Sequence, residues 1–241
     1  MKAYQLRSLA LLILPVLLGA KSEPAAAQQE EGVALAIVYD TSGSMRELVR
    51  DGTGKMAPKY QIARRALESI LQRLRAFATN ASGGGPRKIE AGLFAFSNRS
   101  AKEVVKFGPL ELNSLQNWTR DLPQPNSGTP LGNALSRAGH AVLNSKLSHK
   151  HVLVITDGMN TVGPDPSVTM PRLKKIATET QANFSVHFVA FNVDAKVFDS
   201  VKALGATVVG AADEKQLNTQ LEFILQRKIL LEEEEAPVKK K

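Results

Sequence analysis

Cysteine is absent from the 241 residues of this sequence, which excludes disulfide bonds, zinc–thiolate sites and thiol catalysis. Aromatic side chains are scarce: one tryptophan and three tyrosines leave little material for a platform on which nucleic-acid bases stack. The formal net charge of +8 comes from basic residues dispersed along the chain, apart from the lysines at 239–241. We therefore expect a solvated basic surface and no nucleic-acid partner.

Motifs for nucleotide binding and nucleophilic catalysis are also missing. The sequence has no GxxxxGKS/T phosphate loop, no GxGxxG dinucleotide fingerprint and no GxSxG nucleophile elbow. The segment Asp40-Thr41-Ser42 lacks the second acidic residue that an aspartyl phosphotransferase needs. We therefore assign no catalytic residue.

The composition is that of an ordinary globular protein, with 43% hydrophobic and 22% charged residues. The length suits one large domain or two small ones, and no stretch rich in linker residues divides the chain after its N-terminal segment. We expect one domain over residues 32–228, followed by a charged C-terminal tail over 229–241.

Residues 1–27 have the layout of a secretory signal peptide. Basic residues precede an apolar run from Leu9 to Ala20, and small residues at 25–27 offer a cleavage site. The run is shorter than the roughly 20 apolar residues that a membrane-spanning helix needs. We expect cleavage, export to the periplasm or out of the cell, and no transmembrane segment in the mature chain. An uncleaved membrane anchor is the alternative.

The rest of the chain alternates between apolar runs typical of buried strands and the helical spacing of apolar residues. Strands are expected at 33–39, 89–96, near 104–107, 152–156, 184–191 and 206–209, and helices at 60–77, 131–142, 173–180, 197–204 and 217–228. We expect Gly205 to end the fourth of these helices in a left-handed conformation and Asp213 to cap the last.

This alternation predicts an α/β fold. The strand near 104–107 follows the second strand too closely for a helical crossover, so we expect it to be antiparallel and at an edge. The whole is then a doubly wound, Rossmann-like and mainly parallel six-stranded sheet, with one short antiparallel edge strand and helices on both faces.

Oxygen-bearing side chains follow the strands at the edge where a doubly wound sheet places its working site. Asp40, Ser42 and Ser44 follow the first strand, Asp157 follows the strand at 152–156, and Thr129 precedes the helix at 131–142. Taken singly, each fits a turn or a helix cap, as in Thr129 followed by Pro130. Together they offer two carboxylates and three hydroxyls, which suit Mg²⁺, Mn²⁺ or Ca²⁺ and are poor ligands for Zn²⁺.

Histidine offers a weaker alternative for a metal site. His149 and His151 alternate ahead of the strand at 152–156, and His187 lies inside another strand. No third ligand lies near them in the sequence, so a zinc site is disfavoured.

Three segments of the sequence resemble the signature of von Willebrand factor type A domains. These are the Asp-x-Ser-x-Ser run at 40–44, Ser-Gly-Thr-Pro-Leu-Gly-Asn-Ala-Leu at 127–135 and Val-Ile-Thr-Asp-Gly at 154–158. They occur in the family's order and on the expected elements, and the resemblance spans residues 32–228.

The resemblance implies a metal-ion-dependent adhesion site. By position, Ser42, Ser44 and Thr129 bind the ion directly, while Asp40 and Asp157 bind it directly or through water. Mg²⁺ or Mn²⁺ is the implied ion, with Ca²⁺ as a further candidate. In that family an acidic side chain of a protein partner typically fills the sixth coordination position. An ion touched by few carboxylates keeps positive charge and attracts such an outside carboxylate.

We therefore expect an exported binding module, not an enzyme, which grips an Asp or Glu of a partner protein through a divalent cation. Two alternatives stay open at this point. A metal-assisted hydrolase needs a general base, and only Glu47 and Asp51 in the polar loop at 46–59 offer extra acids. A metal-stabilised structural subunit of a cell-envelope complex would have no exchangeable ligand.

Overall fold

The computed structural model describes residues 29–79, 87–97, 99–126 and 128–230. Three expectations concern residues outside these ranges: the signal peptide at 1–27, the tail from residue 231 onward, and Ser127 in the second signature segment. Among the helices that the structure describes, none is long and apolar enough to cross a lipid bilayer.

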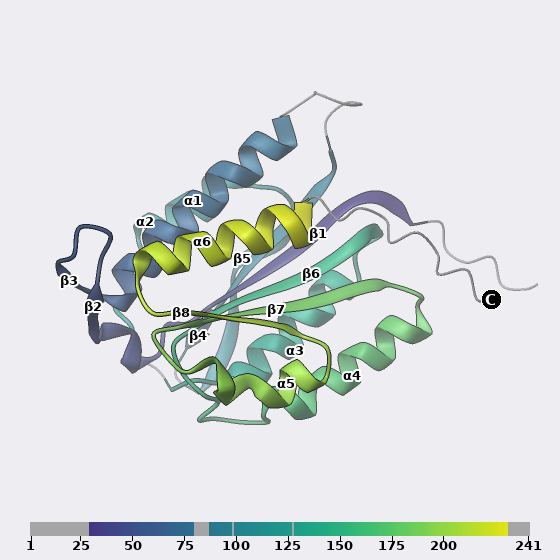
Figure 1. Cartoon of the computed structure of the whole chain (residues 1–241). Coiled ribbons are helices and arrows are strands. Elements are labelled where there is room, and N and C mark those ends of the chain that lie inside the picture. Colours follow the sequence, from purple (N-terminus) through teal and green to yellow (C-terminus); the bar gives the residue numbers. More distant parts are fainter. Residues whose placement is uncertain (1–28, 80–86, 98, 127, 231–241) are drawn as a thin grey trace, which may run out of the picture.

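A six-stranded sheet forms the centre of the molecule, with its strands in the order β5-β4-β1-β6-β7-β8 (Figure 1). The bounds are Ser100–Pro109 for β5, Ile89–Ser97 for β4, Glu30–Tyr39 for β1, Leu147–Thr156 for β6, Asn183–Phe191 for β7 and Thr207–Ala211 for β8. All neighbouring pairs are parallel except β4 with β5, so the antiparallel strand lies at an edge. The predicted sheet is confirmed.

Helices cover both faces of this sheet (Figure 1). On one face lie α1 (Lys59–Thr79), α2 (Leu112–Arg120) and α6 (Glu214–Ile224), and on the other lie α3 (Leu131–Leu143), α4 (Pro166–Glu179) and α5 (Asp199–Ala203). Alternate residues of a strand point to opposite faces. In β1, Leu35 and Ile37 therefore enter the first core, whereas Ala36 and Val38 enter the second. Burial on both faces explains the unbroken apolar run of this strand.

Two local predictions are confirmed near the C-terminal end of the fold. The Asp213 carboxylate accepts a hydrogen bond from the Gln216 N–H and so caps α6. Gly205, just after α5, has φ +88°, a left-handed conformation that glycine adopts without steric penalty. The chain continues from α6 into a π-helical segment, η3 (Leu225–Leu230), two residues beyond the expected end at 228, because Ile229 and Leu230 are buried.

A hairpin of β2 (Leu48–Arg50) and β3 (Met56–Pro58) and the helix α2 lie in stretches for which the sequence predicts no element. Each hairpin strand has three residues, too few for an alternating pattern to be recognised. Helix α2 has nine residues and buries only Leu115 and Thr119. Such short elements leave a weak sequence signal, and tertiary contacts decide their conformation.

Some element bounds also differ from the expectation. The antiparallel strand β5 has ten residues and is not short. Strand β6 begins at Leu147, so His149 and His151 lie within it and not ahead of it. The predicted helix at 197–204 is divided into a 3₁₀ helix, η2 (Ala195–Phe198), and α5. In β6, backbone pairing with β1 and β7 overrides the polar character of its first residues.

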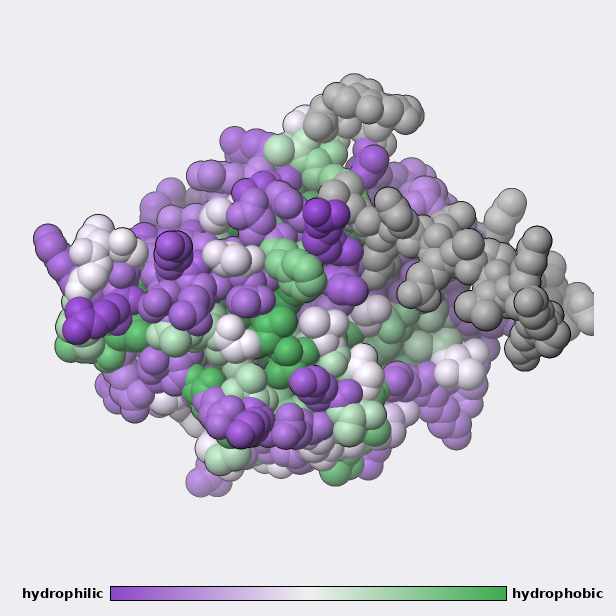
Figure 2. Space-filling view, in the orientation of Figure 1, coloured by the Kyte–Doolittle hydropathy of each residue, from purple (hydrophilic) through white to green (hydrophobic). Residues whose placement is uncertain are grey.

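Figure 2 shows one face of the surface, which is largely hydrophilic over α1 and α6. Apolar side chains gather on this face between α6 and α5, where the edge strand β8 lies. In β8, Val208 and Val209 are partly buried and pack against the two cores. These side chains form the margin of the interior at an edge of the sheet.

Two histidines are buried side by side on neighbouring strands. The rings of His151 on β6 and His187 on β7 have centroids 5.5 Å apart, and His151 Nδ1 lies 3.3 Å from His187 Nε2. Burial lowers the pKa of both side chains, and the pKa of His187 falls to about 4. Both imidazoles are therefore neutral near pH 7, which permits a hydrogen bond between them.

We predict that this pair makes the fold sensitive to acid. The pKa of His187 is about 4 in the folded protein, whereas an unperturbed histidine, as in the unfolded chain, has a pKa of 6.5. As the pH falls, the unfolded chain therefore binds the proton first. The free energy of unfolding then falls as the pH drops below about 6.5, and this residue accounts for a loss of about 3 kcal/mol by pH 4. Urea denaturation of His187→Leu should show a flatter dependence on pH than the wild type.

The matched control is His140→Leu, because His140 is an exposed histidine on α3. That variant should keep the pH dependence of the wild type. The prediction is wrong if the free energy of unfolding of His187→Leu depends on pH as steeply as that of the wild type.

Candidate metal centre

The predicted site lies where the connections of the sheet diverge. From β1 the chain passes to α1 on one face, whereas from β6 it passes to α4 on the other. The two strands are direct neighbours, and Tyr39 pairs with Ile155 at their carboxyl ends. Such a divergence opens a crevice beyond the strand ends. It also places Asp40 and Asp157, which follow these strands, at the same point of the edge.

The turn after β1 brings one acid and two hydroxyls together. Asp40 Oδ1 accepts a hydrogen bond from the Ser42 N–H at 2.7 Å, which fixes the first part of the turn. A short 3₁₀ helix, η1 (Gly43–Arg46), follows with Ser42 in its N-cap position. In this tight winding the hydroxyl oxygens of Ser42 and Ser44 lie 3.0 Å apart.

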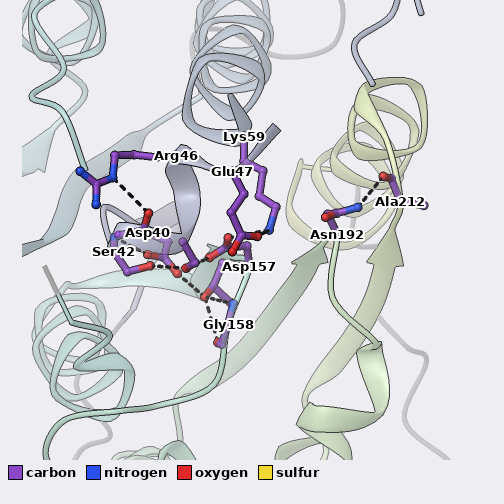
Figure 3. A network of polar contacts seen from close by, with 12 residues as sticks. Asp40, Ser42, Arg46, Glu47, Lys59, Asp157, Gly158, Asn192 and Ala212 are labelled. Carbon is purple, nitrogen blue, oxygen red and sulfur yellow. Dashed lines mark hydrogen bonds and ion pairs between the residues drawn. The ribbon is translucent and has the colours of Figure 1, made fainter. Parts of the chain in front are cut away.

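Asp157 joins this cluster from the neighbouring strand (Figure 3). The Ser44 hydroxyl donates to Asp157 Oδ1 at 2.8 Å. The hydroxyl of Thr156, the last residue of β6, donates to Asp40 Oδ2 at 2.5 Å. Hydrogen bonds thus join four of the five predicted ligands, namely Asp40, Ser42, Ser44 and Asp157, in one cluster.

Thr129 is positioned by a different set of contacts. Its N–H donates to the Thr161 hydroxyl at 2.8 Å, and its carbonyl accepts from the Thr161 N–H at 2.9 Å. The Gly132 N–H donates to Asn160 Oδ1 at 3.1 Å. Thr161 and Asn160 lie in the loop that follows Asp157, so the loops carrying Thr129 and Asp157 are fastened together. In the described part of the chain, the buried Thr129 side chain forms no hydrogen bond with the other four predicted ligands.

Close packing keeps these two loops in register. Gly132 lies in the first turn of α3, and a Cβ atom there would lie 1.9 Å from the carbonyl oxygen of Pro164. Only glycine allows this approach. Pro130 occupies the N-cap position of α3 and has no side chain that could cap it, and the first-turn N–H of Gly132 is bound instead by Asn160 from the loop after β6. Thr129 is therefore not the helix cap that its place before Pro130 suggests, and its hydroxyl is left for another role.

Asp40 carries a fully buried carboxylate whose hydrogen-bond donors, Ser42 and Thr156, are neutral. Burial, and then the negative charge of Asp157, raise the pKa of Asp40 to about 6. The hydrogen bonds from Ser42 and Thr156 act in the opposite direction without offsetting the rise. A buried anion is unfavourable without a counter-charge. The environment of Asp40 therefore favours a cation.

A lysine ammonium reaches the cluster on the side of Asp157. Lys59, the first residue of α1, donates to Asp157 Oδ2 at 3.0 Å and to Glu47 Oε2 at 2.7 Å (Figure 3). The side chains of Lys59 and Asp157 are 4% and 0% exposed, whereas that of Glu47 is 66% exposed. Burial alone would lower the pKa of Lys59. The hydrogen bonds and charges of Glu47 and Asp157 outweigh this effect, and the pKa of Lys59 is raised. The ammonium is therefore charged at neutral pH.

The β2–β3 hairpin is attached to the helices at both of its ends. At its base, the Lys59 N–H donates to the Glu47 carbonyl at 2.9 Å. At its tip, the Gly52 N–H donates to Glu214 Oε2 at 2.6 Å, and Arg65 binds both oxygens of the same carboxylate at 2.7 and 2.8 Å. The hairpin therefore stands at a fixed place beside the cluster, held by α1 and α6.

The chemistry of these groups fits a hard divalent cation. The described part of the chain contains no group of three or more His, Cys, Asp or Glu side chains that could hold a metal. A metal at this edge must therefore use hydroxyls as well as the two carboxylates, and such oxygen ligands suit Mg²⁺ or Mn²⁺. The histidines at 149, 151 and 187 form no metal-binding group either.

Sequence reasoning missed three residues that shape the site. Thr156 immediately precedes Asp157 in the third signature segment, but it ends an apolar run and so resembles an ordinary strand residue. Thr161 lies in a polar loop without a motif. Lys59 ends the polar loop at 46–59, and its role depends on contact with Asp157, 98 positions away. Only Thr156 had a sequence signal, its place beside a predicted ligand.

We predict that Asp40→Asn stabilises the metal-free protein. The amide keeps the shape of the side chain and an oxygen for the Ser42 N–H, but it removes the buried charge. Because the pKa of Asp40 is raised from 3.8 to about 6, its ionisation lowers the free energy of unfolding by up to about 3 kcal/mol at pH 7. Denaturation in excess EDTA should give a higher midpoint for Asp40→Asn than for the wild type.

The exposed Asp121 offers a control, since Asp121→Asn should change the midpoint little. A lower midpoint for Asp40→Asn than for Asp121→Asn would show that the Asp40 charge is already compensated.

Comparison with known sequences identifies a family and a curated relative. The model of the von Willebrand factor type A domain matches residues 34–222. An uncharacterized protein of Bacillus subtilis (strain 168), YwmD, is 26% identical over 207 residues, which cover 82% of this chain and 84% of that protein.

Several solved structures share the fold. The PilB minor pilin from Streptococcus sanguinis has a TM-score of 0.60 and 17% identity, over 84% of this chain and 62% of the pilin. The vWF domain of the type V pili tip protein Mfa5 from Porphyromonas gingivalis has a TM-score of 0.58 and 13% identity, over 81% of this chain and 94% of that domain. Proximal thread matrix protein 1 from the mussel byssus, with a zinc-occupied MIDAS motif, has a TM-score of 0.58 and 15% identity, over 83% of this chain and 48% of that protein.

These structures have the same fold as this chain. At such low sequence identity, the similarity shows the fold alone. The chain spans less than two thirds of the pilin and less than half of the byssus protein. The family rests on the match over residues 34–222 together with the observed sheet of one antiparallel and five parallel strands. The chain belongs to the von Willebrand factor type A domain family.

Proposed function

We propose that this domain binds a divalent cation through Asp40, Ser42, Ser44, Thr129 and Asp157 and uses it to hold an acidic side chain of a partner protein. The observation that carries the proposal is the buried Asp40 carboxylate, whose hydrogen-bond donors are neutral and whose pKa is raised by burial. A divalent ion at this position supplies the counter-charge that the buried acid needs.

The five ligands contribute differently to the proposed complex. The hydroxyls of Ser42, Ser44 and Thr129 bind the ion without neutralising it, whereas Asp40 and Asp157 supply negative charge directly or through water. An ion that a carboxylate binds only through water is incompletely neutralised at short range and attracts a further anion. A carboxylate from outside completes the coordination shell. Mg²⁺ or Mn²⁺ suits such a set of about six oxygens better than Ca²⁺, which takes 6–8 ligands.

Binding is favoured over hydrolysis because the nearby acids are already engaged. A hydrolase needs a general base within reach of an activated water. The Glu47 carboxylate accepts from Lys59 at 2.7 Å. The Asp51 carboxylate accepts from Thr53 and Lys55 and shapes the turn of the hairpin. Neither acid is available as a base without breaking these bonds.

The structural neighbours support a place outside the cell or in its envelope. Two of them are a minor pilin and a pilus tip protein, and a third is a byssus matrix protein whose MIDAS motif holds zinc. These settings agree with protein–protein contact mediated by a metal. The signal-peptide layout of residues 1–27 supports export to the same location.

We predict that Mg²⁺ or Mn²⁺ raises the melting temperature of the wild-type domain. A ligand that binds only the folded state adds about 2.7 kcal/mol to the free energy of unfolding at a hundredfold excess over its Kd. Scanning calorimetry should show this shift in the wild type and in Asp121→Ala. Asp40→Ala should remain folded and lose the shift. An equal shift in Asp40→Ala would place the metal elsewhere.

We also predict that partner binding needs the metal and the Thr129 hydroxyl. A partner can be captured from an envelope fraction with Mg²⁺ and released with EDTA, and its affinity then measured with purified proteins. Thr129→Ala removes one ligand without changing the charge, so it should weaken the complex more than it weakens the fold. Replacing the partner's acid by its amide should cost most of the affinity, because the bound ion then loses its counter-charge.

Thr219→Ala, at an exposed position on α6, is the matched control and should bind the partner as the wild type does. If the partner binds equally well in EDTA and to Thr129→Ala, the adhesion proposal is wrong, and the metal is structural or absent.

A further inference from the structure

The position of Lys59 is unfavourable for a positive charge. Its side chain is 4% exposed, so the ammonium has lost most of its hydration. It is also the first residue of α1, where the free N–H groups of a helix already carry positive partial charge, and the first turn contains no acid. A cation is stable in such a place only because Glu47 and Asp157 accept its hydrogen bonds.

The Asp157 carboxylate is divided between two neighbours of different kinds. Its Oδ1 atom accepts from the Ser44 hydroxyl at 2.8 Å, and its Oδ2 atom accepts from the Lys59 ammonium at 3.0 Å. Figure 3 shows Lys59 and Glu47 on one side of Asp157, with Ser42 and Asp40 on the other. Part of the negative charge of Asp157 is therefore neutralised before any metal arrives.

The charge balance of the site follows from this arrangement. The buried carboxylates of Asp40 and Asp157 carry two negative charges, and the buried Lys59 ammonium carries one positive charge. Glu47 also pairs with Lys59 at 2.7 Å, but its carboxylate is 66% exposed, so the high dielectric of the solvent weakens its effect on the buried groups. A divalent cation bound here is therefore left with about one uncompensated positive charge, whereas without Lys59 the two carboxylates would neutralise it.

We propose that Lys59 is an electrostatic regulator of the metal site, which weakens metal binding and strengthens the capture of an external carboxylate by the bound ion. This inference rests on the proposed function. An ammonium cannot serve as a metal ligand, so Lys59 would act through Asp157, whose Oδ2 atom accepts its hydrogen bond. The domain thus gives up affinity for the metal and gains affinity for an acidic partner.

The test separates the charge of Lys59 from its hydrogen bond. Lys59→Gln keeps a donor for Asp157 and removes the charge, Lys59→Met removes both, and Lys59→Arg keeps the charge. Lys55→Gln removes an exposed lysine from the same hairpin region and serves as the control for distant charge. Each purified full-length variant is titrated with Mn²⁺ alone by calorimetry. Acetate is then titrated into the Mn²⁺-saturated protein, and water-proton relaxation reports its displacement of metal-bound water.

We expect Lys59→Gln and Lys59→Met to bind Mn²⁺ about tenfold more tightly, or better, and to bind acetate correspondingly more weakly. Lys59→Arg and Lys55→Gln should match the wild type in both titrations. Because the two affinities move in opposite directions, a general loss of structure cannot produce the expected result.

Unchanged or weaker Mn²⁺ binding by folded Lys59→Gln would overturn the inference, because Lys59 would then only orient Asp157. If the neutral variants do not fold in EDTA, circular dichroism is followed during addition of Mn²⁺. The inference requires Mn²⁺ to restore the fold at or below the wild-type Kd, and a fold that is not restored refutes it. Absence of Mn²⁺ binding by the wild type would instead refute the proposed function.

Discussion

The negative charge buried at the carboxyl ends of β1 and β6 is the constraint on which the rest of the site depends. The fold creates it by placing Asp40 and Asp157 after two adjacent strands whose connections leave toward opposite faces. Two carboxylates at such close quarters repel each other and are poorly hydrated. The turn after β1, the hydroxyl of Thr156 and the ammonium of Lys59 all direct donors toward these two groups.

The two acids are not treated alike, and that difference gives the site its character. Asp157 is paired with Lys59, whereas Asp40 receives only neutral donors and has a raised pKa. One carboxylate is thus a structural anion, and the other is a charge for which a further cation is favourable. A symmetrical pair of free carboxylates would bind a metal more strongly but would leave it less able to attract another acid.

The sequence predicts the parts of this fold that have long, uniform patterns. Strands such as β1 are apolar on both faces, and α1 repeats its apolar residues over five turns, so their type is evident without a structure. The hairpin at 48–58 and the helix α2 are short; the hairpin is held by a bond to the distant Glu214, and α2 packs Leu115 and Trp118 against the core. The ligand candidates could be read from strand-end position and motif. Lys59 could not, because nothing near it in the sequence indicates Asp157 as its partner.

The contact between Gly132 and Pro164 has a mechanical consequence for the site. Because the backbones touch there, the first turn of α3 lies directly against the loop after β6, and together with the Thr129–Thr161 and Gly132–Asn160 hydrogen bonds this contact fixes the position of Thr129 relative to Asp157. On the other side of the site, Ser42 and Ser44 lie at the start of the 3₁₀ helix η1, and side-chain bonds hold the adjoining hairpin to α1 and α6. A larger residue at position 132 would displace Thr129 relative to Asp157 without altering any of the five predicted ligands.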